Sequence, residues 1–141
     1  MKIYSTYSVK IKNYNRIFSE TVIIYRNAVQ FFMEVCLCIW SNISAIQGNQ
    51  AQMMYVESLC HKTKKNPSPK YDFDTKFYKM PSYIRRASIS EAIGKISSYM
   101  SNLKNWQANP IGKNPMLKGC GYIYPSLYSS CMYKQTYKYR A

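Results

Sequence analysis

The longest regular pattern in this chain is helical, and it covers residues 18–46. Apolar side chains recur there every three or four residues, the period of an α-helix, at Phe18, Val22, Tyr25, Val29, Phe32 or Met33, Cys36, Ile39 or Trp40, and Ile43. The apolar stripe is broad, so this helix should be buried on more than one side. Ser19 is of a type that caps helix N-termini. A turn at Gly48-Asn49 then predicts a shorter helix over residues 50–59.

A third helix is predicted to begin between Ser82 and Ser88. Ser88 to Glu91 has the composition of a capping box, but Pro81-Ser82 would serve equally well as an earlier start. We favour the earlier start, which places Arg85 and Arg86 in the first turns. One face is an apolar packing seam of Ile89, Ile93, Ile96, Met100 and Leu103. The opposite face carries small residues that allow either a helix or a sugar-phosphate strand to come close, namely Ser90, Gly94, Ser97 and Ser101.

Both ends of the chain alternate between two kinds of side chain, which is typical of strands. Residues 2–12 carry lysines on one side, and residues 132–140 place tyrosines against lysine and arginine. These patterns predict a small sheet that encloses a helical middle, and therefore an α+β fold. The most apolar stretch, residues 31–40, is short and contains Glu34, so it indicates a core helix and no membrane span.

The charge is strongly unbalanced, with 20 basic and 6 acidic side chains and a formal net charge of +14. Most of the excess lies after residue 61. Such an excess favours a polyanionic partner, and nucleic acid is the first candidate. Residues 61–79 form a lysine-rich loop that is either solvated or an arm that touches phosphates. The 15 tyrosines would suit base stacking, although most should serve the core or a sheet.

Two blocks of this sequence resemble the TnpB (OrfB) proteins of insertion sequences, the transposon-encoded relatives of type V CRISPR nucleases. The first block runs from Pro81 to Ala87 (Pro-Ser-Tyr-aliphatic-Arg-Arg-Ala) and continues in Ser97 to Trp106. The second combines Gly112-Lys-Asn-Pro115 with Tyr124-Pro-Ser-Leu-Tyr128. The two blocks come in the family's order over about 50 residues, whereas residues 1–77 match only in general character.

The resemblance implies a mainly helical recognition lobe, residues 15–108, inserted between strands of a small, incomplete β-barrel called the wedge. Residues 1–14 would be its first strand and residues 109–141 the return to it. The implied function is that of an N-terminal fragment of an RNA-guided DNA endonuclease, which binds target DNA and guide RNA but lacks the nuclease core. The alternative is a free-standing basic DNA- or RNA-binding regulator of a transposon.

The residues predicted to contact nucleic acid fall into two groups. On the third helix the resemblance implies contacts to the target DNA by Arg85, Arg86, Ser90 and Lys95, and the nearest acid to the arginines on that helix is Glu91. The second group would form a basic wedge surface for guide RNA or lie in the matching loop: Lys10, Lys12, Lys113, Lys134, Lys138 and Arg140.

No catalytic, metal or cofactor site is predicted in this chain. Six acidic residues are too few and too scattered for a two-metal nuclease centre. The five cysteines form no Cys-x-x-Cys pair, so we expect reduced and mostly buried thiols. The chain is therefore expected not to be an enzyme and to be cytoplasmic and nucleoid-associated. A membrane-surface role is the weakest alternative, because no helix sets lysines beside a strong apolar face.

Overall fold

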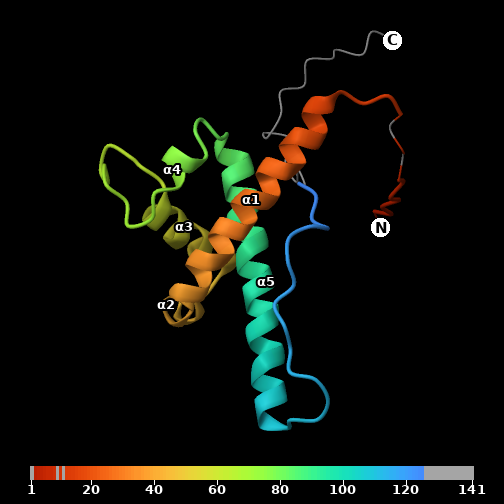
Figure 1. Cartoon of the computed structure of the whole chain (residues 1–141), viewed down its shortest axis with the longest axis vertical. Coiled ribbons are helices and arrows are strands. Elements are labelled where there is room, and N and C mark those ends of the chain that lie inside the picture. Colours follow the sequence, from red (N-terminus) through yellow and green to blue (C-terminus); the bar gives the residue numbers. More distant parts are fainter. Residues whose placement is uncertain (1, 9, 11, 126–141) are drawn as a thin grey trace.

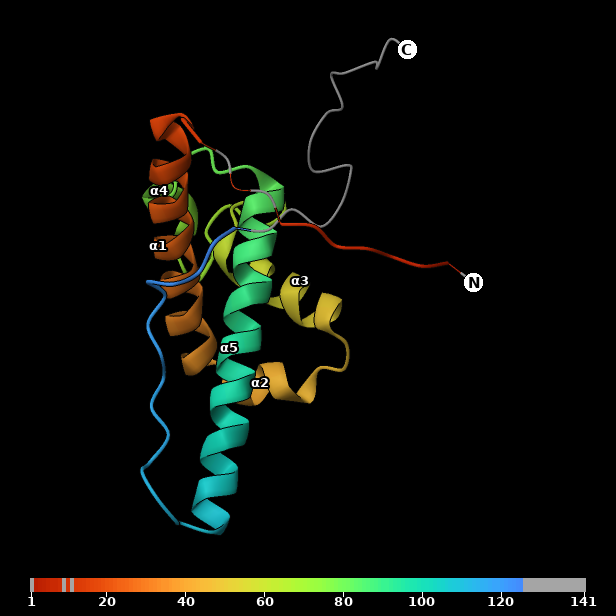
Figure 2. The same ribbon diagram turned by 90° about the vertical axis from the view of Figure 1, so that its right-hand side faces the viewer.

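A computed structural model describes residues 2–8, 10 and 12–125, and this part of the chain is helical (Figure 1). Five helices follow one another: α1 (Arg16–Cys38), α2 (Trp40–Ala45), α3 (Asn49–Cys60), α4 (Phe73–Lys76) and α5 (Ser82–Ala108). The two long helices, α1 and α5, pack along each other, and α3 packs on another part of α5 (Figure 2). The core therefore lies mainly between α1 and α5.

The helix predicted over residues 18–46 is present but interrupted. It begins at Arg16, because the Asn15 side chain accepts a hydrogen bond from the Ile17 amide at 2.9 Å and caps the first turn. Ser19 is therefore not the cap. At Ile39 the backbone leaves the helical region (φ −118°, ψ 20°), which separates α1 from α2. The turn at Gly48 is confirmed, and its φ of +93° is one that glycine adopts without strain.

Helix α5 has the earlier of the two predicted starts, at Ser82. Its seam is confirmed as a packing face, since Ile89, Ile93 and Ile96 are buried.

An aromatic cluster completes the core and attaches α4 to α1. The Phe73 ring stacks on Phe32 with centroids 4.6 Å apart and on Phe77 at 4.7 Å. Burying a side chain of this size contributes about 1.5–3 kcal/mol.

The predicted α+β fold with a β-barrel is wrong: residues 2–8, 10 and 12–125 contain no strand and no sheet. Alternation only shows that a segment could lie on a sheet, since a strand also needs a neighbour to complete its hydrogen bonds. In the first segment, residues 2–8, 10 and 12 are exposed and belong to no helix or strand. The second predicted strand, residues 132–140, lies outside the described residues.

Residues 109–125, which we call the return segment, run back from the end of α5 beside α1 and α5 (Figures 1 and 2). Arg26 of α1 contacts the last residues of the return segment. The Arg26 Nε donates a hydrogen bond to the Ile123 carbonyl at 2.8 Å, and its guanidinium carbon lies 4.9 Å from the centre of the Tyr124 ring. Ile123 and Cys120 are buried, so the return segment closes one side of the helical core.

Helix α1 is long and apolar enough, by length and composition alone, to cross a membrane. Within the molecule, 39% of the most apolar 18-residue stretch of α1 is buried, and the buried side packs against the core. A core helix passes the same test, so the absence of a membrane partner stays a prediction.

Candidate nucleic-acid interface

The most basic part of the described chain is residues 62–79, which we call the basic segment. It connects α3 to α5, includes α4, and carries six lysines, all exposed: Lys62, Lys64, Lys65, Lys70, Lys76 and Lys79. Among residues 2–8, 10 and 12–125, no lysine side chain forms an ion pair with a carboxylate. The positive charge of this segment is therefore not neutralised within the described part of the molecule.

The carboxylates that could have neutralised the lysines have other partners. Glu20 pairs with Arg16 at 3.0 Å, and Glu57 pairs with two arginines. Asp72 accepts the Thr75 amide at 3.2 Å, which caps α4. Glu34 accepts a hydrogen bond from Gln30 at 3.1 Å. The acidic groups thus stabilise local structure and leave the lysines facing solvent.

The basic segment is fixed to the end of α3 by hydrogen bonds to residues 58–61. Asp74 accepts from the Lys62 amide at 2.7 Å and lies 2.9 Å from Nδ1 of His61. Thr63 and Asn66 exchange backbone hydrogen bonds, and the Asn66 side chain donates from Nδ2 to the Ser58 carbonyl at 2.9 Å. The Tyr71 amide donates to the Leu59 carbonyl at 3.0 Å. The lysines therefore stand on a loop that is hydrogen-bonded to α3.

The two arginines predicted as nucleic-acid contacts both bind Glu57 of α3. Arg85 donates to Glu57 Oε1 through Nε at 3.0 Å and Nη2 at 2.8 Å, and only 8% of its side chain is exposed. Arg86 binds the same carboxylate at 3.2 and 3.3 Å but keeps 54% of its side chain exposed. Their partner is thus an acid of another helix, not Glu91, the nearest acid on their own helix. Arg85 is structural in this arrangement, whereas Arg86 can still reach a partner.

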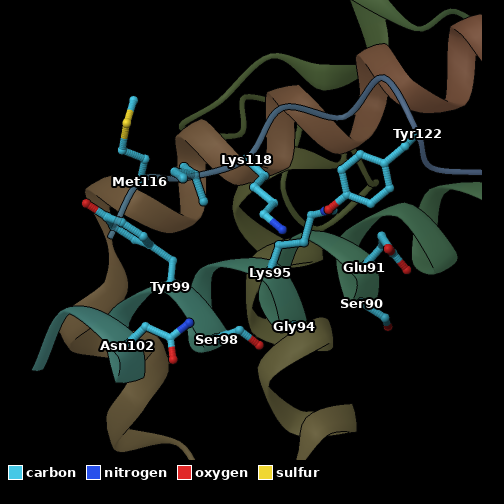
Figure 3. A pocket seen from close by; sticks show the side chains of 11 residues that line it. Ser90, Glu91, Gly94, Lys95, Ser98, Tyr99, Asn102, Met116, Lys118 and Tyr122 are labelled. Atoms are coloured by element: carbon cyan, nitrogen blue, oxygen red, sulfur yellow. The ribbon is translucent and has the colours of Figure 1, made fainter. Parts of the chain in front are cut away.

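Ser90 and Lys95 line a groove of about 520 Å³ between α5 and the return segment (Figure 3). The wall from α5 includes Gly94, Ser98, Tyr99 and Asn102, and the facing wall includes Met116, Lys118 and Tyr122. The small-residue stripe thus faces the return segment through Ser90 and Gly94, and on its other side it lines a small pocket with Asn49 and Gln52 of α3. A Cβ added at Gly94 would have no heavy atom within 4 Å, so the space is not needed for a close contact.

The groove is cationic in its middle. Lys95 and Lys118 extend into it from opposite walls (Figure 3). Lys95 donates a hydrogen bond to the Tyr122 hydroxyl, and its ammonium lies 4.3 Å from the centre of that ring. Glu91 at one end partly offsets the two positive charges. Figure 1 shows the return segment and the basic segment on opposite sides of α5, so the cations form two surfaces.

The other predicted contacts do not join these surfaces within the described chain. Lys113 is exposed in the loop after α5, and Lys10 and Lys12 are exposed in the N-terminal segment. The wedge surface that should have gathered them requires strands that are absent from the described residues. Lys134, Lys138 and Arg140 lie outside those residues.

Sequence reasoning missed the part of the groove that comes from the return segment. Lys118 and Tyr122 are 23 and 27 residues after Lys95 in the chain, and nothing in their spacing indicates that the segment folds back. Tyr99 could have been predicted as a neighbour of Lys95, because it lies one helical turn after Lys95 on the predicted helix. The run of lysines in the basic segment could be recognised from sequence, but the hydrogen bonds that anchor the segment could not.

The described residues offer no site for a metal and no reactive thiol in the core. No group of three His, Cys, Asp or Glu side chains could hold an ion in this part of the chain. Burial raises the pKa of the Cys36 thiol to about 12. The pKa of Cys60 is also raised to about 12, chiefly by burial and then by Cys36 and Asp74. These thiols stay protonated and inert near neutral pH.

Comparison with known proteins places the chain in a family. The Aq_aa04 family matches residues 5–141, almost the whole sequence. The chain belongs to this family. A relative from Aquifex aeolicus (strain VF5), named uncharacterized protein aq_aa04, is 37% identical over 78 residues, which is 55% of this chain and 42% of the relative.

The chain thus spans about two fifths of the length of that Aq_aa04 relative. No solved structure matches this chain. Neither the family nor the relative is named for an activity, and neither name refers to insertion sequences. The resemblance to TnpB proteins therefore stays a prediction from the motifs around Pro81–Trp106 and Gly112–Tyr128.

Proposed function

We propose that this chain binds nucleic acid, with the basic segment as its main phosphate-binding surface. The observation that carries the proposal is that six exposed lysines lie on a hydrogen-bonded loop, and no carboxylate of the described residues is paired to any of them. Lysines are compact charges that suit phosphate. Each phosphate they neutralise releases counterions from the nucleic acid, which drives binding.

The anchoring of the loop supports the same proposal. A loop already held by Asp74 and Asn66 loses little conformational entropy when a phosphate strand binds to it. Arg86 stands on the first turns of α5, just after the basic segment, and adds a guanidinium fork with more than half of its side chain exposed. The α5 groove supplies a second, smaller cationic site through Lys95 and Lys118.

We further propose the biological setting that the resemblance to TnpB proteins implies. In that setting the chain is the nucleic-acid-binding part of a transposon-encoded, RNA-guided DNA endonuclease, and cleavage belongs to a nuclease core that the matched motifs do not include. A free-standing DNA- or RNA-binding regulator of a transposon is the second candidate. Both candidates need the same lysine surface, and they differ in whether the chain acts with a nuclease.

The test is salt-dependent binding to duplex DNA, structured RNA and anionic lipid vesicles. Wild-type protein should bind DNA and RNA with an affinity that falls steeply as salt rises. The double substitution Lys64→Gln with Lys65→Gln should reduce the salt slope by about one for each lost phosphate contact. The charge-matched control Lys2→Gln with Lys104→Gln removes two exposed lysines outside the basic segment.

Two results would overturn the proposal. One is the absence of salt-dependent binding to any nucleic acid. The other is an equal loss of affinity in the two double variants, which would show that net charge matters and the basic segment does not. Binding to vesicles but not to DNA or RNA would favour the membrane-surface alternative.

A further inference from the structure

A pocket of about 790 Å³ opens between α1 and the chain that leads from the basic segment into α5. One wall comes from the solvent side of α1 and includes Asn27, Gln30 and Glu34. The opposite wall comes from residues 76–81 and Ile84, and Phe31 and Phe77 contribute their rings. Lys76 and Lys79, which belong to the basic segment, stand at this second wall. The pocket is thus next to the proposed phosphate-binding surface.

The aromatic rings of the pocket differ in exposure: Phe31 is half-buried, whereas Phe77 is buried and stacks on Phe73. The Lys76 ammonium lies 5.7 Å from the centre of the Phe31 ring and 5.9 Å from that of Phe77. A flexible lysine is therefore what lies nearest these rings on that side, and it can move aside. Tyr78 is 78% exposed beside them. Aromatic rings of this kind stack on bases with little sequence preference.

The α1 wall supplies groups that fit the edge of a base. Asn27, Gln30 and Glu34 are spaced by three and four residues and so share one face of the helix. Gln30 donates a hydrogen bond to Glu34 Oε1. Within the described part of the chain, Glu34 Oε2 accepts no hydrogen bond and the Asn27 side chain forms none. An amide and a carboxylate accept from the exocyclic amino groups of adenine, cytosine and guanine.

We propose that this pocket takes one unpaired base of single-stranded DNA or RNA. Phe31 and Tyr78 would contact the base plane, Asn27 and Glu34 its edge, and Lys76 and Lys79 the flanking phosphates. This proposal rests on the proposed function and deepens it, because it says that the chain prefers nucleic acid with an unstacked base over fully paired duplex. The polar wall argues against an apolar peptide, and the aromatic floor argues against a small free anion.

The experiment compares single strands with duplex, using 12-nucleotide DNA and RNA that carry one 2-aminopurine. The emission of this fluorophore depends on what it stacks on, so transfer of the base from its neighbours to the pocket should change the emission when the single strand binds. The variant Tyr78→Ala with Asn27→Leu should lose single-strand affinity roughly fivefold or more, as expected for a lost base stack. It should keep its duplex affinity and its salt slope. The control Tyr4→Ala with Asn114→Leu changes exposed residues outside the pocket.

A second variant keeps the test informative if the first one folds poorly. Glu34→Gln preserves the shape of an exposed side chain and removes its charge. Because a carboxylate accepts from the amino group of cytosine and thymine has none, wild type should bind oligo(dC) more tightly than oligo(dT). Glu34→Gln should reduce that difference.

The outcomes distinguish failure of the proposed base-binding pocket from failure of the proposed nucleic-acid binding. Nucleic-acid binding with unchanged single-strand affinity and fluorescence in the variants would overturn the pocket alone. Equal weakening of single strand and duplex would also overturn it, because the pocket residues would then act without regard to base pairing. If wild type binds neither DNA nor RNA, the proposed function fails as well.

Discussion

Arg85 donates two hydrogen bonds to a single oxygen of Glu57, through Nε at 3.0 Å and Nη2 at 2.8 Å, where α3 meets α5. Only 8% of the Arg85 side chain and 13% of the Glu57 side chain are exposed. Charge-assisted hydrogen bonds of this kind are stronger than neutral ones. Removing either partner leaves the other charge in a poorly solvated position. The pair therefore holds α3 on α5.

Glu57→Ala should lower the free energy of unfolding by about 3–5 kcal/mol, the range for a buried ion pair that loses one member. Urea denaturation followed by circular dichroism measures it. Glu20→Ala is the matched control, because Glu20 pairs with Arg16 on the surface, where their side chains are 55% and 89% exposed. Its effect should stay below about 1 kcal/mol. Similar effects in the two variants would show that the Glu57 pair is not stabilising.

The same pair shows what the sequence could and could not predict. The helical periods of α1, α3 and α5 could be read from local spacing, as could the buried Ile89, Ile93 and Ile96, because helix packing is encoded within one segment. The partner of Arg85 could not, because Glu57 is 28 residues away and nothing local sets that distance.

The predicted sheet failed for a related reason. Period-two alternation in residues 2–12 describes one segment, whereas a strand also depends on a second segment that supplies hydrogen-bond partners. The groove and the base pocket were missed because each combines a helix face with a distant connecting segment. Chain return of this kind is set by a few contacts, such as Arg26 with the Ile123 carbonyl.

Phe73→Ala should be among the most destabilising single substitutions, with a loss of about 3–5 kcal/mol. Phe73 is fully buried and stacks between Phe32 and Phe77. Its loss would leave a cavity between α1 and α4. Thermal and urea denaturation measure the change. Tyr78→Ala, on an exposed ring, should change stability by less than about 0.5 kcal/mol. A small effect of Phe73→Ala would mean that α4 is not part of the core.

Asp74→Ala should loosen the basic segment without unfolding the protein. The Asp74 carboxylate accepts from the Lys62 amide and contacts His61, so its removal frees the first part of the loop. Limited trypsin digestion should then cut faster after Lys62, Lys64 and Lys65, and mass spectrometry identifies the sites. Urea denaturation should show a much smaller loss than Phe73→Ala. Unchanged cleavage would contradict the anchoring role. Glu20→Ala serves as the control for a lost carboxylate elsewhere.

The buried thiols predict how stability changes in alkali. Burial raises the pKa of Cys36 from its ordinary 9.0 to about 12, and that of Cys60 to about 12. The unfolded thiols therefore release their protons first as the pH rises, and alkali favours the unfolded state. The free energy of unfolding should fall from about pH 9 upward, by up to about 1.4 kcal/mol per pH unit for each thiol.

Tyrosine and lysine titrate in the same range, so the difference between variants carries the test. Cys36→Ala removes one buried thiol and should make the fall between pH 9 and 11 shallower than in wild type, even though its stability near pH 7 is lower. Cys38→Ala, at an exposed thiol, should leave the slope unchanged. Alkylation mapped by peptide mass at pH 8 should modify Cys38 rapidly and Cys36 and Cys60 only after unfolding. Equal slopes in all three proteins would mean that Cys36 is not desolvated in the folded state.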